Sequence, residues 1–274
     1  MDIHTATILN ETTQAFYAAQ AESFSATRQS AWLGWKRVLT DTEWQGEQSQ
    51  CRHAASKPRS ILDIACGNVR FKDFLEAEMP YEAWDYHGVD NCVPLVGAPI
   101  GVAFTECDIV SELIKETSMG GPAVPSALPV LPASIVLADL TVCFGFFHHV
   151  PGTALRKRLL RALCAATKPG GIVAVSLWRF MDEPKLAKKA CESHAAALQY
   201  FSERGVCLSL DEGDYLLGWQ QTRSVFRYCH CFDSAQAHDL ASSVSDIAVL
   251  ADRFRADGRT DNLNEYLVFC VRGD

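Results

Sequence analysis

Short apolar runs alternate with amphipathic stretches between residues 60 and 178 of the 274-residue chain. The runs are rich in β-branched residues and too short for helices, which favours buried parallel strands. We expect strands at residues 60–64, 86–90, 102–106, 135–144 and 172–177. Helical spacing of apolar residues predicts helices between them, including 70–78 and 153–167. This alternation indicates a doubly wound α/β fold with helices on both faces of a parallel sheet.

Both ends of the chain depart from this alternation. An amphipathic pattern at 12–22 predicts that residues 1–57 form a helical preface that acts as a lid. The pattern after residue 178 predicts a helix at 181–204, an irregular segment at 206–221, an extended segment at 224–232 and strands at 247–254 and 265–271. An Asp-Gly pair between the last two strands favours a hairpin. We therefore expect a mostly parallel seven-stranded sheet that ends in an antiparallel hairpin.

The first strand leads into a turn of small residues, Ala65-Cys66-Gly67, ahead of the helix at 70–78. Small residues let a backbone pass close to a ligand, and the helix N-terminus beyond them presents free N–H groups. We expect Gly67 to face that ligand. Ala65 is expected at negative φ. Val69 is expected within the first helical turn, because a β-branched residue is strained at positive φ.

Acidic residues stand at the ends of the first three strands, at Asp63, Asp90 and Asp108. Ligands of open α/β sheets bind at the carboxyl ends of strands, so we expect these acids around one crevice. Asp90 lies where such folds bring a carboxylate to a ribose, whose vicinal hydroxyls can donate two hydrogen bonds. The alternative is that each acid caps a helix or lies in a solvated loop.

Composition and charge narrow the class of protein. Hydrophobic residues make up 48% and charged residues 21% of the chain, as in ordinary globular proteins. Neither a secretory signal nor an apolar run long enough for a bilayer is present, so we expect a cytoplasmic protein without membrane contact. The formal charge of −8 argues against binding nucleic acid through the overall field. The eleven cysteines form no Cys-x-x-Cys pair, and we predict no metal site, even at Cys229-His230-Cys231.

The strand pattern, small-residue turn, strand-end acids and terminal hairpin resemble the class I S-adenosylmethionine-dependent methyltransferases over residues 58–272. The alternative, an NAD-binding Rossmann domain, would require the motif Gly-x-Gly-x-x-Gly, which this turn lacks. The resemblance implies an S-adenosylmethionine-binding methyltransferase domain at 58–274, with 179–232 as a substrate-side insertion. It places the methionine moiety of the cofactor on the first turn, the ribose on Asp90 and the adenine on Asp108. The cofactor-binding residues that it implies are Arg28, Asp63, Ala65, Cys66, Gly67, Asn68, Asp90, Asn91, Asp108, Ile109, Phe144 and Gly145.

A narrower resemblance rests on three segments, which are Phe24-Ser25-Ala26-Thr27-Arg28, residues 214–219 and Arg227-Tyr228-Cys229-His230-Cys231-Phe232. They are similar to segments of the tRNA wobble-uridine methyltransferases that esterify a 5-carboxymethyl group. This resemblance implies that Arg227 clamps the acceptor carboxylate, that Tyr228 and His230 are its hydrogen-bond partners, and that His148 flanks the reacting groups. A carboxylate is already anionic, so catalysis needs positioning more than a general base. The eukaryotic enzymes act with a small activator protein, for which this sequence gives no evidence either way.

Several alternatives stay open. The acceptor could be a carboxylate or hydroxyl of a small molecule instead of tRNA. The fold could also bind the cofactor without turnover, since Ala65 and Val69 replace glycines of the family pattern. Arg227 and Tyr228 could simply tie the extended segment to the core. The basic residues at 156–161 and 185–189, Arg156 included, are expected to form solvated helix faces unless they contact RNA.

Overall fold

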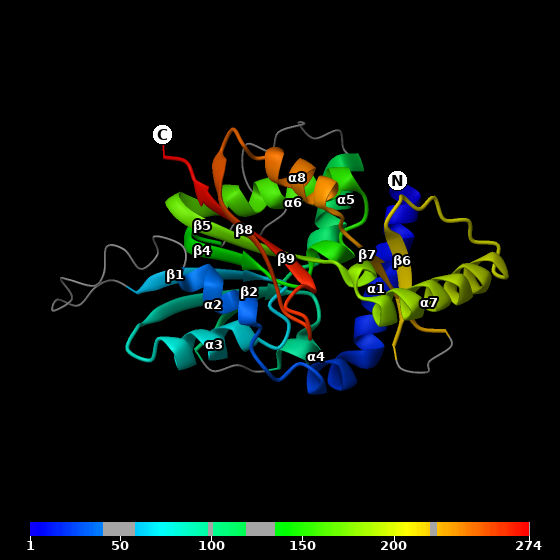
Figure 1. The fold of residues 1–274 in the computed structure, drawn as a ribbon, viewed down its shortest axis with the longest axis horizontal. Helices are drawn as coiled ribbons and strands as arrows, with labels where there is room; N and C mark the ends of the chain where they lie inside the picture. The colour runs from blue at the N-terminus through cyan, green and yellow to red at the C-terminus, as the bar shows by residue number, and fades with distance from the viewer. Residues whose placement is uncertain (41–57, 98–100, 119–134, 220–223, 274) are drawn as a thin grey trace.

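The computed structural model describes residues 1–40, 58–97, 101–118, 135–219 and 224–273. Its main sheet has seven strands in the order β3-β2-β1-β4-β5-β9-β8 (Figure 1). The strands are β1 (Arg59–Ile64), β2 (Trp84–Asp90), β3 (Ala103–Glu106), β4 (Ala138–Cys143), β5 (Thr167–Trp178), β8 (Ala248–Ala256) and β9 (Asn264–Val271). The first five are parallel, whereas β9 is antiparallel to both β5 and β8. The predicted sheet and its terminal hairpin are therefore confirmed.

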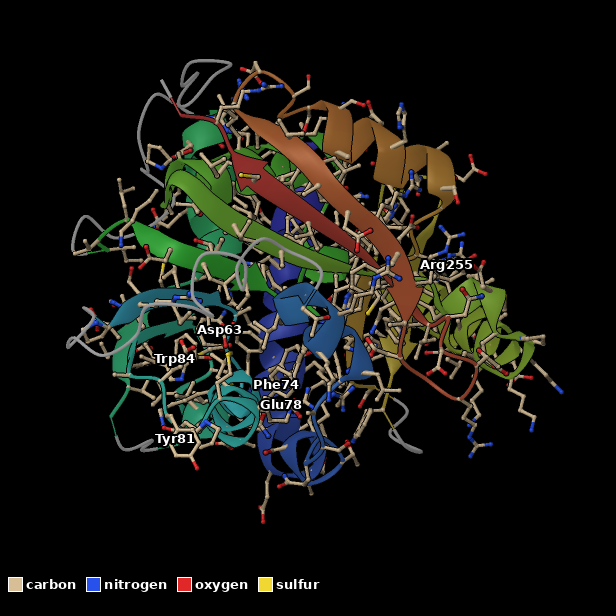
Figure 2. The ribbon with its side chains drawn as sticks, turned by 60° about the vertical axis from the view of Figure 1, so that its left-hand side comes forward. Asp63, Phe74, Glu78, Tyr81, Trp84 and Arg255 are labelled. Carbon is tan, nitrogen blue, oxygen red and sulfur yellow. The ribbon has the colours of Figure 1, made fainter. Side chains whose placement is uncertain are left out.

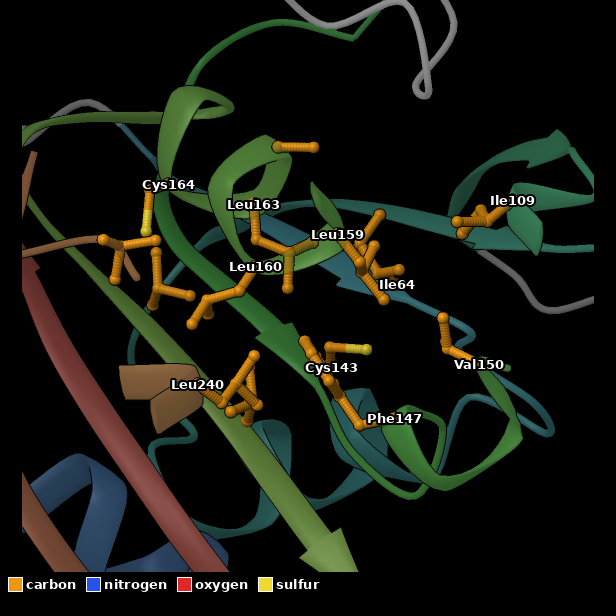
Figure 3. Close-up of a cluster of buried hydrophobic side chains, with 14 of the residues drawn as sticks. Ile64, Ile109, Cys143, Phe147, Val150, Leu159, Leu160, Leu163, Cys164 and Leu240 are labelled. Atoms are coloured by element: carbon orange, nitrogen blue, oxygen red, sulfur yellow. The ribbon is translucent and has the colours of Figure 1, made fainter. Parts of the chain in front are cut away.

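Helices cover both faces of the sheet, as its doubly buried strands require. Figure 1 shows one group of helices above the sheet and another below it. Above lie α5 (Ile109–Ser118), α6 (Thr153–Ala165) and α8 (Ser234–Ser242), and below lie α2 (Leu33–Thr40), α3 (Arg70–Glu78) and α4 (Val93–Val96). Leu62 and Ile64 of β1 pack into the upper core and Ile61 into the lower one, which is the alternation expected of a strand. Figure 3 shows Leu159 and Leu163 of α6 in the upper core beside Ile64.

The N-terminal helix α1 (Ile3–Ala26) is longer than the predicted 12–22. It begins earlier because the Asp2 carboxylate accepts a hydrogen bond from the Thr5 N–H at 2.8 Å and caps it. It packs against α4 and α5, the helices that follow β2 and β3. Helix α1 therefore runs past the carboxyl edge of the sheet. Residues 41–57 of the predicted preface lie outside the described residues.

The segment after β5 forms a separate small layer. The turn η3 (Phe180–Asp182) leads into α7 (Pro184–Ser202), and β6 (Asp214–Gly218) then pairs antiparallel with β7 (Phe226–His230). The prediction that 206–221 is irregular was wrong for β6. Strand β6 has only five residues, the last of them Gly218, so it carries little pattern of its own. It is extended because it pairs with β7. In the described parts of the chain, no helix is both long enough and apolar enough to cross a membrane.

Candidate cofactor and acceptor site

A cavity of about 480 Å³ opens at the carboxyl edge of the parallel strands. It is lined by α1, by the turns that follow β1 to β4 and by β7, so segments far apart in sequence meet there. All of the residues predicted to bind the cofactor line it, namely Arg28, Asp63, Ala65, Cys66, Gly67, Asn68, Asp90, Asn91, Asp108, Ile109, Phe144 and Gly145. Of the predicted catalytic residues, Arg227 and His148 line it as well.

The turn after β1 differs from the prediction in its backbone. Ala65 and Val69 have φ of 58° and 60°, and Gly67 has φ of 53°. The expectations of negative φ at Ala65 and of a helical Val69 were therefore wrong. Val69 instead caps α3 in the left-handed region, where a branched residue costs about 1–3 kcal/mol. Its side chain is buried in the lower core, and that burial offsets the cost.

Asp90 joins two of the loops that form the cavity. Its carboxylate accepts hydrogen bonds from the Gly67 N–H at 2.9 Å and the Cys92 N–H at 2.8 Å. A carboxylate can accept about four hydrogen bonds, so Asp90 can still accept two from the vicinal hydroxyls of a ribose. Burial raises the pKa of Asp90, and the two backbone donors oppose that effect. The predicted ribose acid is thus fixed in place beside the Gly67 backbone.

Asp63 shares the cavity with Asp90, as predicted, but its environment is less polar. It lies inside the fold, whereas Tyr81 in the connection between α3 and β2 is fully exposed (Figure 2). The Tyr86 hydroxyl donates a hydrogen bond to the Asp63 carboxylate. Burial raises the pKa of Asp63 to about 7, and nearby Asp90 adds to the rise. A cationic ligand group at this position would stabilise the charged carboxylate.

Helix α1 supplies residues that the sequence did not reveal. Asn10 Nδ2 donates to Asp108 at 3.1 Å, and the Gln14 side-chain amide also donates to that carboxylate. Ser111 donates through its backbone N–H at 3.1 Å. Asn10 and Gln14 lie one helical turn apart, a spacing that could have marked a polar stripe facing the site. Asp108 is therefore held by α1 as well as by its own loop.

Another part of the cavity lining is cationic and aromatic. Arg227 is buried, and its Nε and Nη1 atoms have no hydrogen-bond partner among the described residues. Its guanidinium carbon lies 4.8 Å from the ring centre of Phe16 and 5.6 Å from that of Trp219. The guanidinium carbon of Arg28 lies 3.4 Å from the ring centre of Phe24, and burial lowers the pKa of Arg28 to about 10. Within the described ranges neither arginine forms an ion pair with a carboxylate.

Two neutral histidines lie next to Arg227. His149 Nδ1 donates to the Tyr228 carbonyl at 2.7 Å, which leaves Nε2 to accept a hydrogen bond from the Tyr17 hydroxyl at 2.9 Å. Burial lowers the pKa of His149 to about 3, and it also lowers the pKa of His148 well below its ordinary value. With Cys229 they form a cluster of metal-type donor atoms within 4.8 Å of one another. Both nitrogens of His149 are engaged in hydrogen bonds, so the cluster offers a metal ion an incomplete set of ligands.

Tyr228 and His230 were predicted to bind the acceptor, but they do not line the cavity. Alternate residues of a strand point to opposite sides, and Arg227 takes the cavity side of β7. On the other side the Tyr228 hydroxyl and His230 Nδ1 contact Asp214 Oδ1 at 2.6 and 2.7 Å. Their polar atoms are thus used inside the protein. The direct role predicted for them is corrected accordingly.

The hairpin between β8 and β9 also lines the cavity, which the sequence did not indicate. The buried Asp257 carboxylate accepts hydrogen bonds from the Gly34 N–H at 3.0 Å, Asn264 Nδ2 at 2.9 Å and the Tyr266 hydroxyl at 2.6 Å. These bonds tie α2 to the hairpin. The Asp-Gly pair that predicted the hairpin therefore also closes one edge of the site.

Known structures share this architecture. An S-adenosylmethionine-dependent methyltransferase from Methanosarcina mazei superposes with a TM-score of 0.52 at 15% identity, over 79% of this chain and 93% of that chain. The complex of DhpI with SAM and HEP superposes with a TM-score of 0.54 at 13% identity, over 95% and 97%. The chain therefore has the fold of the class I S-adenosylmethionine-dependent methyltransferases.

Sequence similarity points to a narrower group. The tRNA (carboxymethyluridine(34)-5-O)-methyltransferase of Arabidopsis thaliana is 26% identical over 168 residues, which make up 61% of this chain and 32% of that protein. The match thus spans about a third of the length of this curated relative. No protein-family model matches the sequence.

Proposed function

We propose that the chain is an S-adenosylmethionine-dependent methyltransferase that esterifies a carboxylate. The supporting observation is the buried Arg227, two of whose guanidinium nitrogens lack a partner in the described structure while lining the cavity. An unpaired buried cation is costly, and a guanidinium matches the geometry of a carboxylate. An anionic ligand would satisfy both nitrogens. The three acids that also line the cavity, Asp63, Asp90 and Asp108, suit a cationic, ribose-containing ligand.

The residues present fit S-adenosylmethionine. The cavity has the size typical of small-molecule sites. Asp90 retains acceptor capacity for the ribose hydroxyls, Asp63 suits the ammonium group, and Arg28 suits the carboxylate of the methionine moiety. When bound, the cofactor supplies an electrophilic methyl group on a sulfonium. Asp108 lies where the adenine is expected, already held by α1.

The chain's own residues then act by orientation and exclusion of water. The acceptor carboxylate is anionic at neutral pH, so no residue has to remove a proton from it. Arg227 orients the carboxylate, and Phe16 and Trp219 restrict the guanidinium on its flanks. His148 stays neutral because burial lowers its pKa, so it adds no competing charge. Alignment of the acceptor oxygen is the main source of rate.

For the acceptor itself we propose 5-carboxymethyluridine of tRNA. The Phe24–Arg28 and Arg227–Phe232 segments and the Arabidopsis relative support this choice. A free carboxylic acid is the second candidate, favoured by the net charge of −8, which is unfavourable for a phosphate backbone. If the isolated chain is inactive on both of these acceptors, the proposal requires a protein activator.

Arg227→Met tests the proposal, because it removes the charge and keeps much of the side-chain volume. We expect the ligand-free variant to be at least as heat-stable as wild type, since a buried unpaired cation is lost. The affinity for S-adenosylhomocysteine should stay within threefold by calorimetry. Methyl transfer to tRNA containing 5-carboxymethyluridine, or to free acids, should fall at least 100-fold, about 2.7 kcal/mol of transition-state stabilisation.

Arg227→Lys separates charge from geometry and should also lose most activity, because an ammonium cannot form the two-point contact. Arg204→Met, at an exposed arginine that stacks on Tyr200, is the matched control and should change neither activity nor cofactor affinity. A melting temperature of Arg227→Met at least 10 °C below wild type, with cofactor affinity lost in parallel, would show that Arg227 is a structural tie instead.

A further inference from the structure

We propose that Asp214 is a positioning residue that sets Arg227 against the acceptor. This inference rests on the proposed function of Arg227. Asp214 lies on β6, does not line the cavity, and its side chain is completely buried. A buried carboxylate is costly unless it is paired and hydrogen-bonded, so its partners indicate its purpose.

The position of Arg227 has to be fixed by contacts on the side of β7 that faces away from the cavity. Its Nε and Nη1 atoms have no hydrogen-bond partner among the described residues, and so the side chain is available to a ligand. Strand β7 is also outside the main sheet and pairs only with β6 in the described structure. The register places Leu217 opposite Arg227 and Asp214 opposite His230. The main sheet therefore does not fix the position of β7, and side-chain contacts have to hold the β6–β7 pair in place.

Asp214 supplies those contacts at both neighbouring positions on the far side of β7. Its Oδ1 atom accepts from the Tyr228 hydroxyl at 2.6 Å and faces His230 Nδ1 at 2.7 Å. Its Oδ2 atom accepts from the Asp211 N–H at 2.9 Å. The residues on either side of Cys229 are thus fastened to one carboxylate, and the residue before Tyr228 is Arg227.

The same carboxylate connects this layer to the upper helices. Arg156 of α6 was predicted to face solvent, but it is buried with Nη2 at 3.9 Å from Asp214 Oδ1. The β6–β7 layer covers this part of α6, which is why the helical pattern misplaced the residue. His230 Nε2 lies 3.1 Å from Gln236 Oε1, which also accepts the Asp233 N–H in the cap of α8. Asp214 therefore fixes β7 relative to the helices of the main domain.

Two hydrogen bonds hold the Tyr228 backbone on the other side. Its N–H donates to Thr13 Oγ1 at 3.0 Å, and its carbonyl accepts from His149 Nδ1 at 2.7 Å. Thr13 and His149 both line the cavity. A shift of β7 on loss of Asp214 would thus move the wall that carries Arg227. The cofactor end, formed by other loops, would be unaffected.

Asp214→Asn and Tyr228→Phe test the proposal with a larger and a smaller perturbation. The first variant removes the charge of the carboxylate, and the second removes only the hydroxyl that donates a hydrogen bond to it. We expect both variants to bind S-adenosylhomocysteine within twofold of wild type. The KM for tRNA containing 5-carboxymethyluridine should rise at least tenfold in Asp214→Asn and about threefold in Tyr228→Phe, with a smaller change in kcat. Asp239→Asn, at an exposed aspartate on α8, is the matched control and should behave as wild type.

A readout independent of turnover is the NMR signal of Arg227 Nε–H, assigned by its absence in Arg227→Lys. It should shift or broaden in Asp214→Asn and Tyr228→Phe but not in Asp239→Asn. An unchanged signal together with an unchanged KM overturns the positioning role. Parallel loss of acceptor and cofactor binding in the milder Tyr228→Phe variant also overturns it, in favour of a general structural role. If wild type transfers no methyl group, the proposed function fails, and the NMR signal still decides whether Asp214 positions Arg227.

Discussion

Asp63→Asn should make the protein more stable at neutral and alkaline pH while leaving its shape intact. Asp63 is only 4% exposed, and its carboxylate receives the Tyr86 hydroxyl hydrogen bond. An asparagine oxygen can accept the same bond. The substitution therefore removes a carboxylate that burial makes difficult to ionise.

The size of the effect follows from the pKa of Asp63, which is raised from 3.8 to about 7 in the folded protein. Between these values the unfolded chain loses its proton while the folded protein keeps it, so stability falls as pH rises. The total loss is about 4 kcal/mol, at roughly 1.4 kcal/mol for each pKa unit. Roughly 2.5 kcal/mol of it falls between pH 5 and 8. Above pH 8 the folded protein is ionised as well, and the difference stays constant.

Urea unfolding of the ligand-free protein at pH 5, 6, 7 and 8 measures this effect. The free energy of unfolding of Asp63→Asn minus that of wild type should grow by roughly 2.5 kcal/mol over this range. Asp85→Asn, at an exposed aspartate of the neighbouring strand β2, should show no such trend. A constant difference for Asp63→Asn from pH 5 to 8 would refute the raised pKa and the apolar environment from which it follows.

Two further predictions concern the backbone around the site. Ala65→Gly should stabilise the protein by about 0.5–1 kcal/mol in urea unfolding, because glycine adopts the φ of 58° without strain. Ala77→Gly, at an exposed position of helix α3, should destabilise it by about 1 kcal/mol, and equal losses for the two variants would contradict the left-handed turn. A Cβ at Gly34 would lie 2.3 Å from a ring carbon of Tyr266, so Gly34→Ala should lower the free energy of unfolding by about 1–3 kcal/mol. A Cβ at Gly273 would have no atom within 4 Å, so Gly273→Ala should cause no measurable change. A neutral Gly34→Ala would contradict the packing of α2 on the hairpin.

The sheet and the cofactor end of the cavity were predictable because both follow from local sequence. Parallel strands buried on two faces give short apolar runs, and the carboxyl ends of neighbouring strands meet at one edge. Asp63, Asp90 and Asp108 therefore meet in the structure as expected. The conformation of Val69 was not predictable, because the burial that offsets its strain is a property of the assembled core.

The acceptor end was harder to predict because it depends on how separate layers pack. The period of β7 places Arg227 and Tyr228 on opposite sides, but only the packing of α1 and β6 decides which side faces the cavity. Arg156 follows a helical surface pattern, yet the β6–β7 layer buries it. Asn10 and Gln14 share one face of α1, but only the packing of α1 on α5 brings that face to Asp108.

The most direct test of carboxylate methylation uses S-adenosylmethionine labelled in its methyl group, wild-type protein and tRNA containing 5-carboxymethyluridine, with free carboxylic acids in parallel. Alkali treatment of the product distinguishes an ester, which releases labelled methanol, from an ether or an N-methyl group. We predict alkali-labile label that depends on Arg227 and on one of these acceptors. Alkali-stable label, or calorimetry that detects no cofactor binding at all, would contradict the proposed carboxylate methylation.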